Sequence, residues 1–302
     1  MPDVIDWLRG IVTVLNTPFT DDDRVDPDSL VDNIQAALDA GVAGFLIPAM
    51  ASEVDKLTAE ERTLLVKTTV AAAAGRAAVI GGASAPDAEL RGRHAQTLID
   101  LGCDGVLASI PFIDEQDYVQ QVRALAALRP GFLMLQDWDF QGYGLPVPLI
   151  VHLFETVEAF QSIKIEVVPA GIKYSEVLRA TGGKLHVAGG WAVMQMIEAL
   201  DRGVHTLMPT AMHIIYTRIM RRYVSGDRGS AQTLFHRLLP TLAFSNQHLD
   251  ISIVFFKRLL HRQGLYRTAR VREPILPFDA AHERIADERI ADVMGLMREL
   301  QA

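Results

Sequence analysis

One lysine lies where a side chain could act as a nucleophile. Lys164 stands between Ile163 and Ile165, in an apolar segment typical of a strand that is buried on both faces. Because side chains alternate along a strand, Lys164 points away from the two isoleucines and toward the interior. Loss of solvation lowers the pKa of an ammonium group, and the resulting amine can form a Schiff base with a carbonyl carbon. The alternative is a lysine whose end reaches solvent or pairs with Glu166.

A second chemical group follows two positions later. Glu166 shares a strand face with Lys164, so it could act as acid and base toward a molecule bound to that lysine. It could equally pair with Lys173 or cap the helix that follows. The acid and base role depends on the strand register, because a shift by one residue would turn Glu166 outward.

The strands that position these residues recur along the chain. Three segments, ALDAGVAGFLIP, LIDLGCDGVLASIP and ALDRGVHTLMPT, each combine a helix end, a glycine suited to the left-handed position after a helix, a short apolar run and a proline. Five more apolar runs are typical of strands, and they lie at 11–15, 77–81, 132–136, 162–165 and 184–188. The sequence therefore predicts eight strands.

Helical patterns fill the intervals between the strands. Asp26 as N-cap, Pro27 and Gly41 delimit one helix. Thr58 and Glu61 form a capping box that starts another, which runs to about residue 75. Further helices are expected near 86–101, 115–128, 147–157, 171–180, 191–202 and 212–224.

This alternation predicts an α/β fold. Eight buried strands that each precede a helix indicate a (β/α)8 TIM barrel over residues 1–224. An open doubly wound sheet is the alternative, but Gly81 and Gly82 alone do not make the glycine-rich turn of such folds. Residues 225–302 lack strand signals and show three amphipathic helical segments. We expect a C-terminal helical extension whose Leu and Phe stripes are packing surface.

Composition excludes several classes of protein. The 302 residues are 49% hydrophobic and carry a net charge of -8 without a basic stripe, which argues against nucleic-acid and membrane partners. Acidic residues near the N-terminus and the absence of a long apolar run argue against export and membrane spans, so we expect a cytoplasmic protein. The single Cys103 excludes an intrachain disulfide and fits a buried small residue better than a nucleophile.

In a barrel, chemistry is expected at the C-terminal ends of the strands. A metal site would need several carboxylates or histidines there, and the third, fourth and fifth strand ends offer only Asp137, so we expect no metal. Gly189 and Gly190 after the seventh strand could cradle a phosphate, but tight entry into the next helix explains them equally well.

Six segments, in order along nearly the whole chain, carry a family resemblance: LNTPFTDDDRVD, PAMASEVDKLTAEER, GCDGVLASIPF, SIKIE, VAGGW and ISIVFFKRLLHRQGLYRTARVREPILP. The chain resembles the dihydrodipicolinate synthase and N-acetylneuraminate lyase family of pyruvate-type aldolases. The resemblance implies a barrel with a C-terminal helical domain, assembled as a dimer or tetramer. It also implies a covalent Schiff base on Lys164 with pyruvate or another 2-keto acid, an aldehyde-type second substrate and no separate cofactor.

The resemblance also assigns roles around the substrate. It implies that backbone N–H groups at Ala51 and Ser52, with the Ser52 hydroxyl, hold the carboxylate of the keto acid. Other residues at the strand ends are expected to line the substrate site, namely Met50, Asp137, Gly189 and Met208.

The chain departs from the family pattern where that pattern is catalytic. Met50 replaces the first hydroxyl of the proton relay, and Gln136 replaces the tyrosine that transfers protons. A Gln amide orients a substrate but does not titrate. Phe112 and Ile113 replace a second tyrosine pair, and Gln141 lies near the place of the arginine that grips the aldehyde's carboxylate. Lysine-pathway synthase activity is therefore not expected.

The loop after the fifth predicted strand is aromatic. Trp138, Phe140 and Tyr143 would suit an apolar or aromatic electrophile, and they could equally serve as a lid or as subunit contacts.

Two functional hypotheses remain. The first is a Schiff-base (class I) aldolase or lyase that makes or breaks a carbon–carbon bond or removes water, with Lys164, Glu166 and Gln136 as its catalytic residues. The alternative is a catalytically altered or inactive homologue that binds a keto acid or a partner without turnover.

Overall fold

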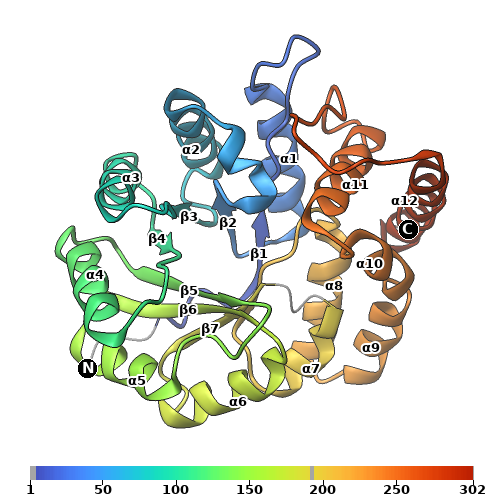
Figure 1. The fold of residues 1–302 in the computed structure, drawn as a ribbon. Helices are drawn as coiled ribbons and strands as arrows, with labels where there is room; N and C mark the ends of the chain where they lie inside the picture. The colour runs from blue at the N-terminus through green and yellow to red at the C-terminus, as the bar shows by residue number, and fades with distance from the viewer. Residues whose placement is uncertain (1–4, 191–193, 302) are drawn as a thin grey trace. The chain divides into compact units, whose positions relative to one another are not determined.

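Eight parallel strands close into a barrel in chain order (Figure 1). The computed structural model describes residues 5–190 and 194–301. The strands are β1 (Gly10–Val14), β2 (Gly44–Ile47), β3 (Ala78–Gly82), β4 (Gly105–Ala108), β5 (Leu133–Asp139), β6 (Phe160–Val167), β7 (His186–Gly189) and β8 (Thr206–Leu207). The predicted (β/α)8 barrel is confirmed, and the open-sheet alternative is wrong.

A helix follows each strand. The helices are α1 (Pro27–Ala40), α2 (Ala59–Ala73), α3 (Ala88–Asp100), α4 (Glu115–Ala127), α5 (Val147–Thr156), α6 (Ala170–Ala180), α7 (Met196–Asp201) and α8 (His213–Val224). Two short 3₁₀ turns, η1 (Met50–Ser52) and η2 (Val54–Lys56), precede α2. The helix expected at 191–202 begins later, at Met196, and residues 191–193 lie outside the described part of the chain.

Local chemistry explains the helix ends. The Asp26 side chain accepts a hydrogen bond from Ser29 N at 3.3 Å and so satisfies an orphan donor of α1. Gly41 ends α1 with a φ of 84°, a conformation that costs least for glycine. The predicted capping box of α2 is present, with Thr58 and Glu61 each bonded to the other's backbone N–H.

The C-terminal region holds four described helices rather than the three expected. They are α9 (Arg228–His236), α10 (Leu239–Ser245), α11 (Leu249–Arg262) and α12 (Ala280–Gln301). The first predicted segment ends as a helix at His236, and α10 begins anew with Pro240 in its first turn, where a missing N–H costs nothing. The boundary at residue 224 stays a prediction.

The chain forms two compact units, which we describe separately. The β3–β8 unit comprises the residues up to Val12 and Ala78–Met208, and the C-terminal unit comprises Thr13–Ala77 and Pro209–Ala302. In the β3–β8 unit, α5 and α6 pack on β6 (Figure 1).

Polar groups at the start of the strands in the β3–β8 unit satisfy one another. His186 Nδ1 lies 2.7 Å from Ser162 Oγ, and its Nε2 lies 2.8 Å from the carbonyl oxygen of Leu8. Burial lowers the pKa of His186 to about 3, so the ring is neutral near pH 7. This end of the β3–β8 unit is thus built for stability, as is usual for the N-terminal face of a barrel.

No helix in the described ranges has the length and apolar character needed to cross a membrane. Cys103 is buried, and burial raises the pKa of its thiol to about 12.

Candidate active site

Three predicted catalytic residues come together on adjacent strands of the β3–β8 unit. Gln136 on β5 lies in register with Lys164 on β6. Lys164 is 6% exposed, and its Nζ lies 2.9 Å from Glu166 Oε2. Gln136 Nε2 donates to the same carboxylate oxygen at 2.6 Å. Strand alternation predicted that Lys164 and Glu166 share one face, and their contact confirms it, while the register of β5 on β6 adds Gln136 to that face.

One part of the structural alternative for Lys164 is observed and the other is not. Lys164 pairs with Glu166, as that alternative expected, but its end is buried and does not reach solvent. Lys173 ion-pairs with another carboxylate, so Glu166 is not its partner. Glu166 can therefore exchange a proton with the Lys164 amine directly.

Gly190 makes room for the Glu166 carboxylate. A Cβ atom placed on Gly190 would collide with Glu166 Oε1 and Cδ. This close approach explains the glycine at position 190 without a phosphate ligand. Gly189, one residue earlier, ends β7, and its carbonyl accepts a hydrogen bond from Met208 N at 2.9 Å, which continues the β7–β8 pairing to the buried Met208.

Asp137 does not join this group. It lies one position after Gln136, in register with Ile165, so its side chain points to the opposite face of β5. There its Oδ2 lies 2.5 Å from Nζ of Lys173, a residue of α6, and its Oδ1 accepts from Leu145 N at 2.9 Å. Burial raises the pKa of Asp137, and Lys173 opposes that shift. The structure thus gives Asp137 a structural partner instead of a place beside Lys164.

The same ion pair anchors the loop that follows β5. Lys173 Nζ also donates to the carbonyl oxygens of Leu145, at 2.7 Å, and of Tyr143. Sequence reasoning considered Lys173 only as a partner for Glu166. Its structural role depends on contacts between α6 and a loop nearly 30 residues away in the sequence. No local sequence pattern predicts such contacts.

The predicted carboxylate-binding turn lies in the C-terminal unit as η1. Two of its carbonyl oxygens accept side-chain hydrogen bonds. Asn16 Nδ2 donates to Ala51 O and Thr17 Oγ1 donates to Ser52 O, each at 2.6 Å. The Ser52 hydroxyl donates to Leu15 O at 2.6 Å. That hydroxyl proton is therefore used inside the protein. Met50 of the same turn is 37% exposed.

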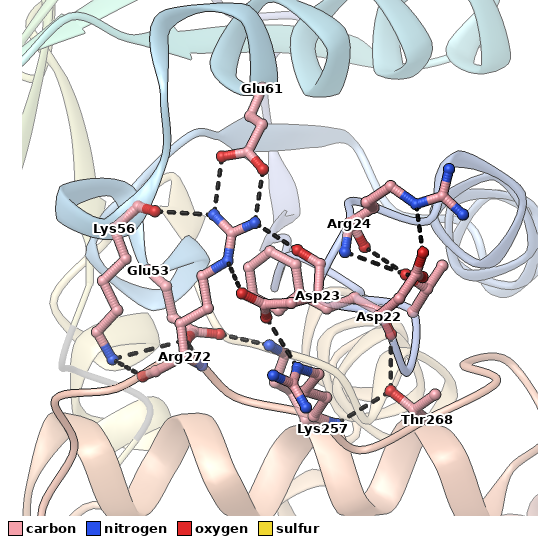
Figure 2. Close-up of polar contacts among 12 residues, drawn as sticks. Asp22, Asp23, Arg24, Glu53, Lys56, Glu61, Lys257, Thr268 and Arg272 are labelled. Atoms are coloured by element: carbon pink, nitrogen blue, oxygen red, sulfur yellow. Dashed lines mark hydrogen bonds and ion pairs between the residues drawn. The ribbon is translucent and has the colours of Figure 1, made fainter.

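Glu53, directly after this turn, is fixed by residues from the C-terminal part of the chain (Figure 2). It is buried with φ 56°, forms an ion pair with Lys257 of α11 and accepts from Arg272 N at 2.8 Å. The Lys257 ammonium lies 4.2 Å from the centroid of the Phe19 ring. Burial lowers the pKa of Lys257 to about 8, and Glu53 opposes that shift. Arg272 in turn pairs with both carboxylate oxygens of Glu61. The sequence analysis did not identify this network.

Within the described ranges, no group of three or more His, Cys, Asp or Glu residues is arranged to hold a metal ion.

Comparison with known proteins agrees with this architecture. The chain is 27% identical over 305 residues to a 4-hydroxy-tetrahydrodipicolinate synthase of Xanthomonas campestris, with 96% of each chain covered. It is 25% identical over 300 residues to an L-2-keto-3-deoxyarabonate dehydratase of Azospirillum brasilense, covering 95% of this chain and 96% of the relative.

A crystal structure of dihydrodipicolinate synthase from Rhodopseudomonas palustris superposes with a TM-score of 0.88 at 20% identity, over 97% of this chain and 100% of the other, which shows the shared fold. The model of the dihydrodipicolinate synthetase family matches residues 7–291. This chain therefore belongs to the dihydrodipicolinate synthetase family and has its aldolase/lyase fold.

Proposed function

We propose that this chain is a Schiff-base (class I) aldolase or lyase for pyruvate or a related 2-keto acid, with Lys164 as the nucleophile. The observation that carries the proposal is the small number of partners at Lys164. In the described structure its buried ammonium meets one acceptor, Glu166, although an ammonium carries three protons. A buried amine whose hydrogen-bonding capacity is largely unfilled is suited to receive a substrate.

The contacts support a specific order of proton transfers. Glu166 takes a proton from the Lys164 ammonium, and the free amine attacks the keto carbon to give a carbinolamine. Glu166 returns that proton to the carbinolamine oxygen, which leaves as water and forms the iminium. Glu166 then takes a proton from the adjacent carbon, the electron pair of that C–H bond forms the new C=C bond, and the C=N pair moves to nitrogen, which gives the enamine. Gln136 holds Glu166 in place for these transfers.

The keto acid needs a partner for its carboxylate. We propose the turn at Ala51 and Ser52 for this role, as the family resemblance implies. Because the Ser52 hydroxyl donates to Leu15 O and Ser52 N donates to Ala49 O at 2.8 Å, the backbone N–H of Ala51 is the better donor of the turn, with the hydroxyl available only after rotation. Met50, Gly189 and Met208 remain proposed substrate contacts, while Asp137 does not, because it serves Lys173.

A second candidate reaction is the removal of water from a 2-keto acid that carries a hydroxyl group two carbons from its keto carbon. The Azospirillum relative is named a dehydratase for a 2-keto-3-deoxy acid. Glu166, 2.9 Å from Lys164, supplies a titratable group that could take the proton next to the iminium and later protonate the departing hydroxyl.

The proposed partners and assembly follow the same resemblance. We propose a 2-keto acid and an aldehyde-type electrophile as substrates, and a homo-oligomer, dimer or tetramer, as the working form. Light scattering on the purified chain tests the assembly.

Borohydride reduction with a panel of 2-keto acids, followed by peptide mass mapping, tests the central proposal. Pyruvate should add covalently at Lys164, and Lys164→Ala should abolish the adduct. Lys67→Ala is the matched control, because Lys67 is exposed on α2 and its loss should leave the adduct intact. An adduct mapped to Lys173 or Lys184, or none with any keto acid, would remove the proposal. An adduct without turnover of any electrophile would favour the non-catalytic alternative.

A further inference from the structure

Trp138 lies beside the Lys164 group on the same face of the barrel sheet. On β5 it follows Gln136 by two residues, and in the β5–β6 ladder it is in register with Glu166. Side chains two apart on a strand share a face, and the Cβ atoms of residues directly opposite on neighbouring strands lie about 5 Å apart. The Trp138 and Glu166 side chains therefore leave the sheet side by side, at the C-terminal end of β5.

Trp138 has an aromatic neighbour, and both rings are exposed. The ring centroids of Trp138 and Phe140 lie 5.5 Å apart with an interplanar angle of 63°, an edge-to-face arrangement. Trp138 is 49% exposed and Phe140 is 42% exposed. Exposed apolar surface at the mouth of a polar site marks a place where a ligand is bound.

The segment that carries this pair is held in place. Asp139 Oδ1 accepts hydrogen bonds from the backbone N–H groups of Gln141, at 2.9 Å, and Gly142, at 2.8 Å. The buried Asp137 and Lys173 anchor Leu145 at the far end of the loop. An aromatic surface that is already ordered loses little conformational entropy when it binds a ligand.

The charged groups close to Trp138 are already paired. Glu166, on the neighbouring strand, lies 2.9 Å from the Lys164 ammonium. Asp139 follows Trp138 and so belongs to the opposite face of β5, and its carboxylate accepts a hydrogen bond from Gln141 N. The aromatic pair is therefore an apolar surface with no cation of its own to hold a second carboxylate.

We propose that Trp138 and Phe140 form the wall against which the second substrate lies, and that this substrate is an aldehyde with an aromatic or branched apolar body. This inference deepens the proposed function and rests on it, because the aldehyde reacts with the enamine formed on Lys164. The nucleophilic enamine carbon attacks the aldehyde carbon, and the C=O electron pair moves to oxygen, which takes a proton. Water then hydrolyses the iminium and releases a 4-hydroxy-2-keto acid that carries the apolar body.

The test compares three aldehydes with pyruvate as the common partner: benzaldehyde, glyceraldehyde and succinic semialdehyde. Benzaldehyde should condense with a kcat/KM about tenfold or more above the other two, a ratio that corresponds to about 1.4 kcal/mol. Trp138→Ala should lower kcat/KM for benzaldehyde about tenfold or more. It should change kcat/KM for glyceraldehyde by less than about twofold. In Trp138→Ala, the pyruvate concentration that gives half of the maximal borohydride adduct should not change.

Trp7→Ala is the matched control. Trp7 is 60% exposed, and its ring packs at 6.2 Å on Phe132, just before the first residue of β5. The two tryptophans thus lie near opposite ends of the same strand, so Trp7→Ala should leave kcat/KM unchanged for all three aldehydes. Trp138→Phe, which keeps an aromatic ring, should retain most of the benzaldehyde activity.

The outcomes separate this inference from the proposed function. Absence of a pyruvate adduct on the wild-type chain defeats the proposed function itself. A normal adduct combined with a preference for glyceraldehyde or succinic semialdehyde, or with no condensation of benzaldehyde, overturns the aromatic wall alone. The proposed aromatic wall is also contradicted if Trp138→Ala lowers kcat/KM equally for all three aldehydes, or if it changes only the oligomeric state.

Discussion

Two glutamate–lysine pairs, one in each compact unit, differ in how completely the lysine is surrounded. In the C-terminal unit, Lys257 pairs with Glu53, which also accepts from Arg272 N, and the ammonium lies on the ring of Phe19. In the β3–β8 unit, Lys164 contacts Glu166 through one oxygen. Both lysines are buried, so burial alone does not identify a nucleophile.

A third buried lysine sharpens the comparison. Lys173 is surrounded by three oxygen acceptors, from Asp137, Tyr143 and Leu145, which match its three ammonium protons. A lysine in that position holds a loop. Lys257 shares with Lys164 a single carboxylate acceptor, but the Phe19 ring also covers its ammonium. Among the described contacts, the Lys164 ammonium has neither a covering ring nor further acceptors, and this feature points to chemistry.

The largest expected effect is the loss of turnover when Lys164 is replaced. Lys164→Met should abolish both the borohydride adduct and any turnover, because no other amine lies next to Glu166 among the described residues. Lys164→Arg is the sharper variant, since a guanidinium keeps the pairing with Glu166 but stays protonated. Peptide mass mapping measures the adduct, and a pyruvate-consumption assay measures turnover. Residual turnover in Lys164→Arg would show that the ion pair, and not the amine, is what the reaction needs.

The next effect concerns proton transfer by Glu166. Glu166→Gln should still form the pyruvate adduct, because the amine remains, but more slowly, and it should lower kcat by about 10² to 10⁴, the usual contribution of a general acid or base. Gln136→Ala should mainly raise KM, since the amide orients Glu166 without titrating. Steady-state kinetics beside adduct yield separates the two roles. Full turnover in Glu166→Gln would move the base elsewhere, for example to the substrate's own carboxylate.

Breaking the structural pair should lower stability instead of chemistry. Lys257→Met leaves the buried Glu53 with Lys56 Nζ, 3.6 Å from its Oε2, as its remaining ion-pair partner, so the free energy of unfolding should fall by less than the about 3 to 5 kcal/mol typical of a buried charge left alone. The double variant Lys257→Met/Glu53→Gln removes both charges and should recover most of that loss. Urea unfolding of both variants provides the measurement. A double variant as unstable as the single one would mean that the Glu53 carboxylate is needed for its bond to Arg272 N.

The smallest effect is the pH dependence contributed by His186. Its pKa is about 3 in the folded chain and about 6.5 in a model peptide, so the unfolded chain binds more protons between these values. The stability it contributes is therefore present above pH 6.5 and is lost as the pH falls toward 3. His186→Gln should flatten the fall in urea midpoint between pH 7 and pH 4, and the exposed His236→Gln should not. Equal slopes in both variants would contradict the assignment.

Much of the fold followed from the sequence because its signals are local. Capping residues at Asp26 and Thr58, the glycine at position 41 and the apolar runs between them act within a few residues, so strand and helix positions agree closely with the structure. The shared face of Lys164 and Glu166 also follows from alternation within one strand. The extra helix α10 was missed because the predicted segment ended at Pro240, whereas this proline lies in the first turn of a new helix.

The sequence alone determined the order of the elements, the barrel class and the strand face of Lys164, since each depends on periodicity or on neighbours along the chain. Only the tertiary structure decided which carboxylate each lysine pairs with. Asp137 turns to Lys173, Glu166 pairs with Lys164 against the space left by Gly190, and Glu53 meets Lys257, 204 residues away. The pairing of buried charges depends on which groups would lack a partner once the helices and strands have packed. A local sequence pattern does not determine that pairing.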